Sequence, residues 1–516
     1  MNSVFLRLKN IWNKNPISIT IALVSIFVLF FVNAFTAYGI FRDELYYIAC
    51  SKHLAFGYVD QPPLLALILT INNFIFGDSL FAIRILPAFC EAGIIIFIGL
   101  IVKELGGNKF AVLIASLTAF LFPVYLSIND FYSMNCFDLL FWAACFYTLI
   151  RIFKTENQKL WITFGILVGF GLQNKYSIMF LCFGIYVGML FTPLRKYYLS
   201  KWFWIGNIIA ALIFLPHIIW EITYGWPSLE FIHNASVEKN APISFLDFLS
   251  GQIMQANPVN ILIWLPGLFY LLISKEVKLF RVFAFGYIIL FLLFVFQNGK
   301  AYYLSPYYPI LIAGGSIAIE KLILAKKLAW LKPALVSTII IAGIISMPMA
   351  LPILPPETFA RYSASLGIKP GGEERDQPVK LGQHYADMFG WKELVDSVAT
   401  VFNTLTPEEK KHCAILARNY GQAGAIDYFG KKYGLPDAIC GHNSYWYWGP
   451  PDWNGEVLIS IEGSEAAYKN DFKSYYRAGT IDHPYSRSFE RHLPVYVCKG
   501  LKVPIKKVWP ELRFVI

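Results

Sequence analysis

Charged residues are scarce in this chain, and the scarcity excludes most soluble folds. Of the 516 residues only 15% are Asp, Glu, Lys or Arg, whereas 56% are hydrophobic, and the mean hydropathy is +0.51. An ordinary soluble domain is about 25% charged. The composition therefore predicts a polytopic membrane protein. The net charge of +10 is spread in short basic runs between apolar segments, so it predicts membrane orientation and no nucleic-acid binding.

The sequence also lacks the usual signs of metal and nucleotide chemistry. Its eight cysteines show neither a CxxC motif nor a Cys/His ligand spacing, so no metal site is predicted. We find no phosphate-binding Gly loop and no Ser/His/Asp elbow, and 421–424 (Gly-Gln-Ala-Gly) is too weak a pattern for a nucleotide site. Cys413, Cys440 and Cys498 fall in the C-terminal portion, where one disulfide is allowed but none is required.

Long apolar segments are what the chain does have. A span needs about 20 mostly apolar residues. We therefore expect about eleven transmembrane helices, near 17–40, 81–102, 110–128, 136–153, 160–173, 177–193, 202–222, 258–274, 280–297, 303–322 and 333–352. The first is followed by no small-residue cleavage site, and we expect it to be a retained anchor.

Basic residues alternate between the connections of these segments. If the N-terminus is cytoplasmic, the cytoplasmic connections hold eighteen Lys and Arg residues, whereas the opposite connections hold only Arg42, Lys52, Lys175, Lys239 and Lys300. By the positive-inside rule, the loops 41–80 and 223–257 and the segment 353–516 then lie outside the cytoplasm. An enzyme that works there has no nucleotide sugar or ATP, so its donor would be carried by a lipid.

Composition divides the chain near residue 352. We expect a mainly α-helical transmembrane module over 1–352 and a soluble extracytoplasmic α/β domain over 353–516. The domain has candidate strands at 413–417, 457–461 and 495–498 and a candidate helix at 423–433. In the outer loops, 64–76 is apolar but too short to span, which predicts a helix that lies in the membrane interface or is re-entrant. Ser244 and Asp247 form a helix-start signal.

The first outer loop carries the candidate catalytic acids. Asp43 and Glu44 are adjacent, so on a helix their side chains point about 100° apart, and one can face a cavity while the other holds the backbone. A transferase that joins a sugar to an alcohol needs a carboxylate to take the acceptor proton. The alternative is a helix cap with a first-turn acid. Asp60 is either a second carboxylate of the same pocket or part of a proline-stiffened turn.

A second group of candidates combines lysines with tyrosines. Lys300, Tyr302 and Tyr303 lie at the outer end of two predicted spans, where an ammonium and phenol hydroxyls suit a lipid phosphate. Lys175, alone between two apolar segments, invites the same interpretation. The alternative for both is an interfacial aromatic belt with a snorkelling lysine.

Four motifs carry a family resemblance over nearly the whole chain. They are Arg42-Asp43-Glu44-Leu45-Tyr46-Tyr47 with 57–63 (Gly-Tyr-Val-Asp-Gln-Pro-Pro), 300–304 (Lys-Ala-Tyr-Tyr-Leu), 419–425 (Asn-Tyr-Gly-Gln-Ala-Gly-Ala) and 441–446 (Gly-His-Asn-Ser-Tyr-Trp). With them the chain resembles GT-C glycosyltransferases of the dolichyl-phosphate-mannose-protein mannosyltransferase type, a class that includes the bacterial aminoarabinose lipid A transferases.

The resemblance implies an activity and its partners. It implies a bacterial inner-membrane enzyme that inverts the sugar carbon, with Asp43 as base and Arg42, Tyr46 and the lysine and tyrosine candidates as substrate-binding residues. The donor would be a polyprenyl-phosphate sugar and the acceptor a lipid, a glycan or a protein. Because the donor has a single phosphate, no cofactor is obligatory, and a divalent metal is allowed but not required.

Two other classes of function stay open on the sequence. A transporter or flippase of a lipid-linked sugar would need charges near the bilayer midplane and repeat-related halves with broken helices. A membrane receptor could bind carbohydrate on the aromatic run 445–448, although core packing also explains that run.

Overall fold

The structure is a computed structural model, and it describes residues 15–239, 243–371, 374, 380–449 and 452–516. The basic residues predicted before residue 15 lie outside this range. The chain divides into two compact units. Within the described residues, unit 1 contains 15–35, 77–218 and 243–353, and unit 2 contains 36–76, 219–239 and the described part of 354–516.

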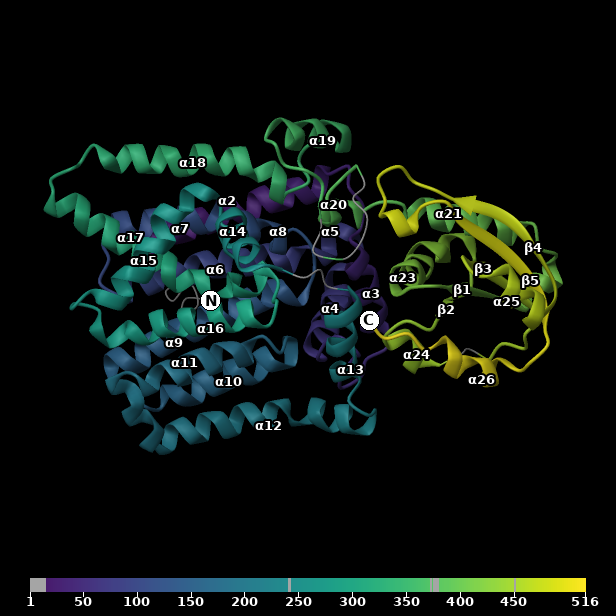
Figure 1. The fold of residues 1–516 in the computed structure, drawn as a ribbon, viewed down its shortest axis with the longest axis horizontal. Coiled ribbons are helices and arrows are strands. Elements are labelled where there is room, and N and C mark those ends of the chain that lie inside the picture. Colours follow the sequence, from purple (N-terminus) through teal and green to yellow (C-terminus); the bar gives the residue numbers. More distant parts are fainter. Residues whose placement is uncertain (1–14, 240–242, 372–373, 375–379, 450–451) are drawn as a thin grey trace. The chain divides into compact units, whose positions relative to one another are not determined.

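Unit 1 is built of apolar helices, drawn from purple to green in Figure 1. Their bounds are α2 Pro16–Phe35, α5 Leu80–Ile83, α6 Ile85–Glu104, α7 Lys109–Phe120, α8 Pro123–Asn129, α9 Met134–Thr155, α10 Leu160–Asn174, α11 Ile178–Leu190, α12 Lys201–Thr223, α14 Phe245–Gln255, α15 Ile261–Ile273, α16 Arg281–Phe296, α17 Tyr308–Ala325 and α18 Leu331–Ala350. The last residues of α12 belong to unit 2. Each of the eleven predicted spans overlaps one or more of these helices.

The protein is a multi-pass membrane protein with several helices long enough to cross a bilayer. Among the described residues, seven helices have the length and apolar composition of a span, and up to ten do so if each of three bent helix pairs counts as one. The bent pairs are α7 with α8, α11 with the 3-10 turn Pro193–Leu199, and α14 with α15. The shorter α10 has 15 residues and corresponds to the fifth predicted span.

Glycines allow the closest helix crossings in unit 1. A Cβ on Gly315 of α17 would lie 1.8 Å from the Ile263 carbonyl oxygen of α15, and one on Gly267 of α15 would lie 1.9 Å from the Leu311 carbonyl oxygen. Small residues at helix interfaces are typical of membrane proteins because they let backbones approach. The predicted helix-start signal is confirmed, since Ser244 and Asp247 form a capping box at the start of α14.

Unit 2 combines short helices with a mixed sheet. Its helices are α3 Arg42–Lys52, α4 Leu64–Phe76, α13 Pro227–Asn234, α19 Pro356–Ser365, α20 Gln383–Ala386, α21 Trp391–Asn403, α22 Pro407–Lys411, α23 Tyr420–Phe429, α24 Ser444–Trp448, α25 Glu465–Asp471 and α26 Ile505–Val508. The five strands are β1 Cys413–Ala417, β2 Ala438–Cys440, β3 Val457–Ile461, β4 Phe472–Ile481 and β5 Leu493–Leu501, in the order β2-β1-β3-β5-β4. The β1 strand pairs in parallel with β2 and β3, and β5 is antiparallel to β3 and β4.

Helices cover both faces of this sheet. Alternate side chains such as Ala414, Leu458 and Cys498 form a core with Tyr468 of α25 and Trp509. Figure 1 shows α21 and α23 on one side of the sheet and α24 and α26 on the other. A sheet buried on both faces has nearly continuous apolar strands, which is why 413–417 and 457–461 were recognisable. These two predicted strands are confirmed, and β5 extends the predicted strand 495–498.

The α4 helix confirms the predicted helix at 64–76, with two contrasting faces. Leu65 and Leu69 are fully buried. Ile71 and Phe74 lie on the opposite side and are 52% and 91% exposed. A 13-residue helix with an exposed apolar face is typical of a helix in a membrane interface.

Candidate active site

The two acids at the start of α3 have different surroundings. Glu44 is fully buried, and its Oε2 accepts the backbone N–H of Phe41 at 2.9 Å, which is the contact of a helix cap. The side chain of Asp43, the preceding residue, is 33% exposed. The helical spacing therefore turns one acid inward to hold the backbone and leaves the other accessible.

Two glycines bring α23 against α3. A Cβ on Gly424 would lie 2.8 Å from the Leu45 carbonyl oxygen, and one on Gly421 would lie 2.7 Å from Cγ of Arg42. This approach lets Tyr420, the first residue of α23, donate its hydroxyl to Oδ1 of Asp43 at 2.9 Å. Burial raises the pKa of Tyr420 well above its ordinary value, so the phenol keeps the proton that it donates.

Arg42 lies in a buried network of charges. Its guanidinium forms ion pairs with Asp43 at 3.6 Å, Glu374 at 3.5 Å and Asp387 at 3.7 Å. Arg487 shares two of these three acidic partners, because it contacts Asp387 at 3.1 Å and Glu374 at 2.9 Å. Burial alone would lower the pKa of Arg42, but Asp387 and the other acids raise it well above its ordinary value, so the guanidinium stays charged.

A buried carboxyl supports the start of α23. Asn419 caps this helix through the backbone N–H groups of Gly421 and Gln422. Its amide also donates to Oε1 of Glu490 at 2.7 Å, and the Gln422 amide donates to Oε2 at 2.8 Å. Burial raises the pKa of Glu490 to about 7 despite these two donors.

Asp60 and Tyr46 belong to the same unit as Asp43. The buried Tyr46 donates its hydroxyl to Oδ1 of Asp60 at 2.9 Å and lies 2.6 Å from Oγ of Ser444. The pKa of Tyr47 is raised mainly by burial and then by the charges of Asp43 and Asp60, so both carboxylates act on this one phenol. The structure therefore brings the three predicted acids into one unit, each in a different role.

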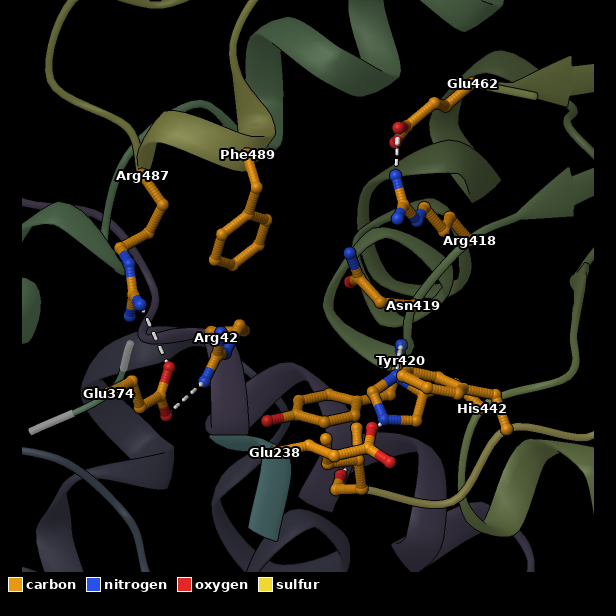
Figure 2. Close-up of a pocket in the computed structure, with 12 residues that line it drawn as sticks. Arg42, Glu238, Glu374, Arg418, Asn419, Tyr420, His442, Glu462, Arg487 and Phe489 are labelled. Carbon is orange, nitrogen blue, oxygen red and sulfur yellow. Dashed lines mark hydrogen bonds and ion pairs between the residues drawn. The ribbon is translucent and has the colours of Figure 1, made fainter. Parts of the chain in front are cut away.

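A cavity of about 290 Å³ lies beside this cluster. Its charged lining consists of Arg42, Arg418, Arg487, Glu238, Glu374 and Glu462. Figure 2 shows Glu374 facing both Arg42 and Arg487, and Arg418 paired with Glu462.

Aromatic rings form the other walls of this cavity. They are Tyr420, Phe489, Phe514 and the imidazole of His442. Nδ1 of His442 accepts the backbone N–H of Tyr420 at 3.4 Å, and its Nε2 lies 3.1 Å from the backbone oxygen of Ile516. This arrangement fits a neutral ring that carries its proton on Nε2. Asp43 is not itself among the lining residues, but its neighbour Arg42 and its hydrogen-bond partner Tyr420 are.

The predicted lysine and tyrosine group lies in unit 1. Nζ of Lys175 donates to Oδ1 of Asn135 at 2.6 Å and lies 3.9 Å from Oδ2 of the buried Asp138. It also lies 5.5 Å and 5.8 Å from the ring centres of Tyr302 and Tyr303. Lys300 is close enough for its charge to act on Lys175. The structure therefore brings together all four residues predicted for phosphate binding. Two ammonium groups and two phenols suit a phosphate monoester.

Sequence reasoning missed the residues around Asp43 that come from the C-terminal part of unit 2. Tyr420, which donates to Asp43, follows it by 377 residues. The residues Asp387, Arg487 and Glu490, which support Arg42 and α23, belong to no motif. The detectable signal was the 419–425 motif, whose glycines serve helix packing. Among the described residues, no group of three or more His, Cys, Asp or Glu side chains could hold a metal ion. Cys413, Cys440 and Cys498 are buried free thiols.

Comparison with known proteins places the fold in a class. The family model of the dolichyl-phosphate-mannose-protein mannosyltransferases matches residues 60–220. The solved structure of ArnT from Cupriavidus metallidurans in the apo state matches 93% of this chain and 97% of its own, with a TM-score of 0.58 and 14% identity. The chain thus has the fold of the GT-C glycosyltransferases, which confirms the resemblance and the fold class predicted from the sequence.

Two further solved structures and one curated relative are also similar to this chain. The same ArnT bound to undecaprenyl phosphate matches with a TM-score of 0.56 and 13% identity over 94% of this chain and 98% of the other. An oligosaccharyltransferase of Archaeoglobus fulgidus in the apo form matches with a TM-score of 0.55 and 14% identity, over 87% and 70% of the two chains. The lipid A galacturonosyltransferase RgtD of Rhizobium johnstonii is 23% identical over 191 residues. That match spans 37% of this chain and 40% of the relative.

Proposed function

We propose that the protein is a membrane glycosyltransferase that moves a sugar from a polyprenyl-phosphate donor to an acceptor hydroxyl, with Asp43 as the general base. The observation that carries this proposal is the accessible Asp43 carboxylate, held by Tyr420 and Arg42 beside a cavity. The similarity to ArnT, solved with undecaprenyl phosphate, supports the class of donor.

The reaction is a direct displacement. The acceptor oxygen attacks C1 of the donor sugar from the face opposite the phosphate, so the configuration at C1 inverts. The C1–O bond to the acceptor forms as the C1–O bond to phosphate breaks, and polyprenyl phosphate leaves with the bonding electrons. Asp43 takes the acceptor proton and later releases it to water. A positioned base of this kind contributes roughly 10²- to 10⁴-fold to the rate.

The surrounding residues hold the Asp43 carboxylate in place. The Tyr420 hydroxyl donates to Oδ1 at 2.9 Å, and Nε of Arg42 lies 3.6 Å from the same oxygen. Glu44 holds the start of α3 through its cap contact. We assign Asp60 to positioning, because its Oδ1 accepts the hydroxyl of Tyr46 from the middle of α3.

The donor phosphate is assigned to the cluster of Lys175, Lys300, Tyr302 and Tyr303 in unit 1. The leaving group bears negative charge, and ammonium groups with phenol donors stabilise such charge. Because a phosphate monoester leaves without protonation, this assignment needs no second acid.

We further propose that the enzyme lies in a bacterial inner membrane with unit 2 on the periplasmic side. The asymmetry of basic residues between alternate connections supports this orientation. The segments 36–76 and 219–239 form one compact unit with the C-terminal part, which supports two outer loops and an external α/β domain. The exposed apolar face of α4 would lie in the membrane interface, near the depth of a lipid-linked donor.

Labelled donor tests the proposed reaction. The purified full-length protein is placed in proteoliposomes with polyprenyl-phosphate sugars, radiolabelled in the sugar, and an envelope extract as the source of acceptor. We expect free polyprenyl phosphate and a new labelled glycoside in equal amounts. Transport of intact donor across the bilayer without a new glycosidic bond would instead show a flippase and refute the proposal.

A further inference from the structure

The cavity beside Asp43 has a charge pattern that is unusual for a phosphate site. It is lined by three arginines and three glutamates, and every arginine already contacts a carboxylate. Glu374 faces both Arg42 and Arg487 (Figure 2). An anion that approached these arginines would also approach the glutamates paired with them, and like charges repel.

The same pairs suit an uncharged ligand with many hydroxyl groups. A hydroxyl can donate to a carboxylate and accept from a guanidinium at once, and hydrogen bonds to charged groups are the stronger ones. The Asn419 side chain adds an amide to this lining.

Aromatic rings supply the apolar wall that a sugar ring needs. The side chains of Phe489 and Phe514 line the cavity and are 38% and 47% exposed. Phe514 is held by its backbone, which donates to the Gly441 carbonyl oxygen at 2.9 Å and accepts from the Asn443 N–H at 2.8 Å. These bonds hold the backbone of Phe514, and its ring packs against the imidazole of His442 with the ring centres 4.9 Å apart.

The cavity size limits the ligand to a small group. Its volume of about 290 Å³ lies just below the roughly 300–1,000 Å³ range of small-molecule sites. This size accommodates one sugar ring better than an extended headgroup.

We propose that this cavity binds one uncharged sugar unit of a glycan acceptor, next to Arg42 and Tyr420, the two residues that contact Asp43. The proposal rests on the proposed function and names the acceptor class for the same site. It distinguishes this protein from an enzyme that glycosylates a phosphate or an acidic sugar, because an anion in this cavity would meet three glutamates beside three arginines that are already paired with carboxylates.

Saturation-transfer NMR on the full-length protein in nanodiscs tests the proposal without turnover. The probes are the methyl glycosides of glucose, galactose and mannose, each with the matching uronide that differs by one carboxylate. We expect at least one neutral glycoside to bind roughly ten-fold more tightly than its uronide. Binding of no neutral glycoside, or equal binding of the uronides, would overturn the proposal.

Three variants test where the glycoside binds and whether the paired charges of the cavity disfavour an anionic ligand. Phe514→Ala should weaken the neutral glycoside at least about five-fold, whereas Tyr476→Ala, which removes another 47% exposed ring from unit 2, should have no effect. Glu462→Gln frees the charge of Arg418 and should raise the affinity for the uronide. Unchanged affinities in Phe514→Ala or in Glu462→Gln would contradict the assignment.

Asp43→Asn separates this proposal from the proposed function, because it should still bind the glycoside while transfer is lost. If transfer fails in the wild type but the glycoside binds, the proposed function falls and the sugar site stands. If transfer proceeds and no neutral glycoside binds, only the sugar site falls.

Discussion

The crossing of α3 and α23 at Gly424 allows a sharp test of how the site is held. In Gly424→Ala the new Cβ would start 2.8 Å from the Leu45 carbonyl oxygen, whereas ordinary contact begins at 3.4 Å. The two helices must therefore separate by about 0.6 Å, and overpacking of this kind costs about 1–3 kcal/mol of stability.

The displacement acts on the bond between Tyr420 and Asp43, one turn away. A hydroxyl that moves from 2.9 Å by that amount reaches about 3.5 Å, where little of the hydrogen bond remains. A hydrogen bond to a charged group contributes about 1.5–3 kcal/mol. If the transition state needs it, kcat falls roughly 10- to 100-fold.

The assay measures kcat for release of polyprenyl phosphate together with the apparent Tm. Gly479→Ala in β4 is the matched control, because its Cβ would lie 3.7 Å from Val401 Cγ2, and it should keep wild-type activity. The double variant Gly424→Ala with Tyr420→Phe should be no slower than the slower single variant, because both act on one bond. Multiplied losses in the double variant would refute this reasoning.

Three further variants test separate parts of the account. Tyr420→Phe removes the hydroxyl that orients Asp43, so kcat should fall roughly 10-fold while KM for the donor changes less than about two-fold; a change confined to KM or to Tm would contradict a positioning role. Lys300→Ala should raise donor KM roughly ten-fold, whereas the exposed Lys326→Ala should not, and equal effects would remove Lys300 from the phosphate site. Burial raises the pKa of Glu490 in the folded state to about 7, above its ordinary 4.5. Its contribution to the free energy of unfolding is therefore complete below pH about 4.5 and is lost, by about 3 kcal/mol, as the pH rises through 7. The apparent Tm should fall over this pH range in the wild type and less in Glu490→Gln, and identical slopes of Tm against pH would contradict the raised pKa.

The sequence predicted the elements whose pattern is set by burial. The strand at 413–417 is apolar throughout and the strand at 457–461 is apolar except for Ser460, because both faces of the sheet are covered. The short helix at 64–76 was recognisable from its length, which is too small for a span.

Elements without such a pattern were missed. The ten-residue β4 was not predicted, since it lies at the sheet edge and carries exposed polar residues such as Lys473 and Ser474. The three-residue β2 is too short to show any periodicity. Local hydrophobic patterns say little about such strands, because their pairing depends on distant neighbours.

The candidate base was predictable, but its support was not. Asp43 stood out because charges beside an apolar segment are costly. That Tyr420 holds Asp43, while Arg487 shares acidic partners with Arg42, follows from a helix packing between segments hundreds of residues apart. The small residues of 419–425 indicated a close approach, but not the helix that they approach.

The most direct test of the central claim is single-turnover transfer by Asp43→Asn. The substitution keeps the size of the side chain and an oxygen that can accept the Tyr420 hydroxyl, but removes the base. The account predicts that the transfer rate falls roughly 10²- to 10⁴-fold, with donor binding unchanged and the exposed Asp437→Asn fully active. A transfer rate equal to that of the wild type, in a folded Asp43→Asn protein, would contradict it.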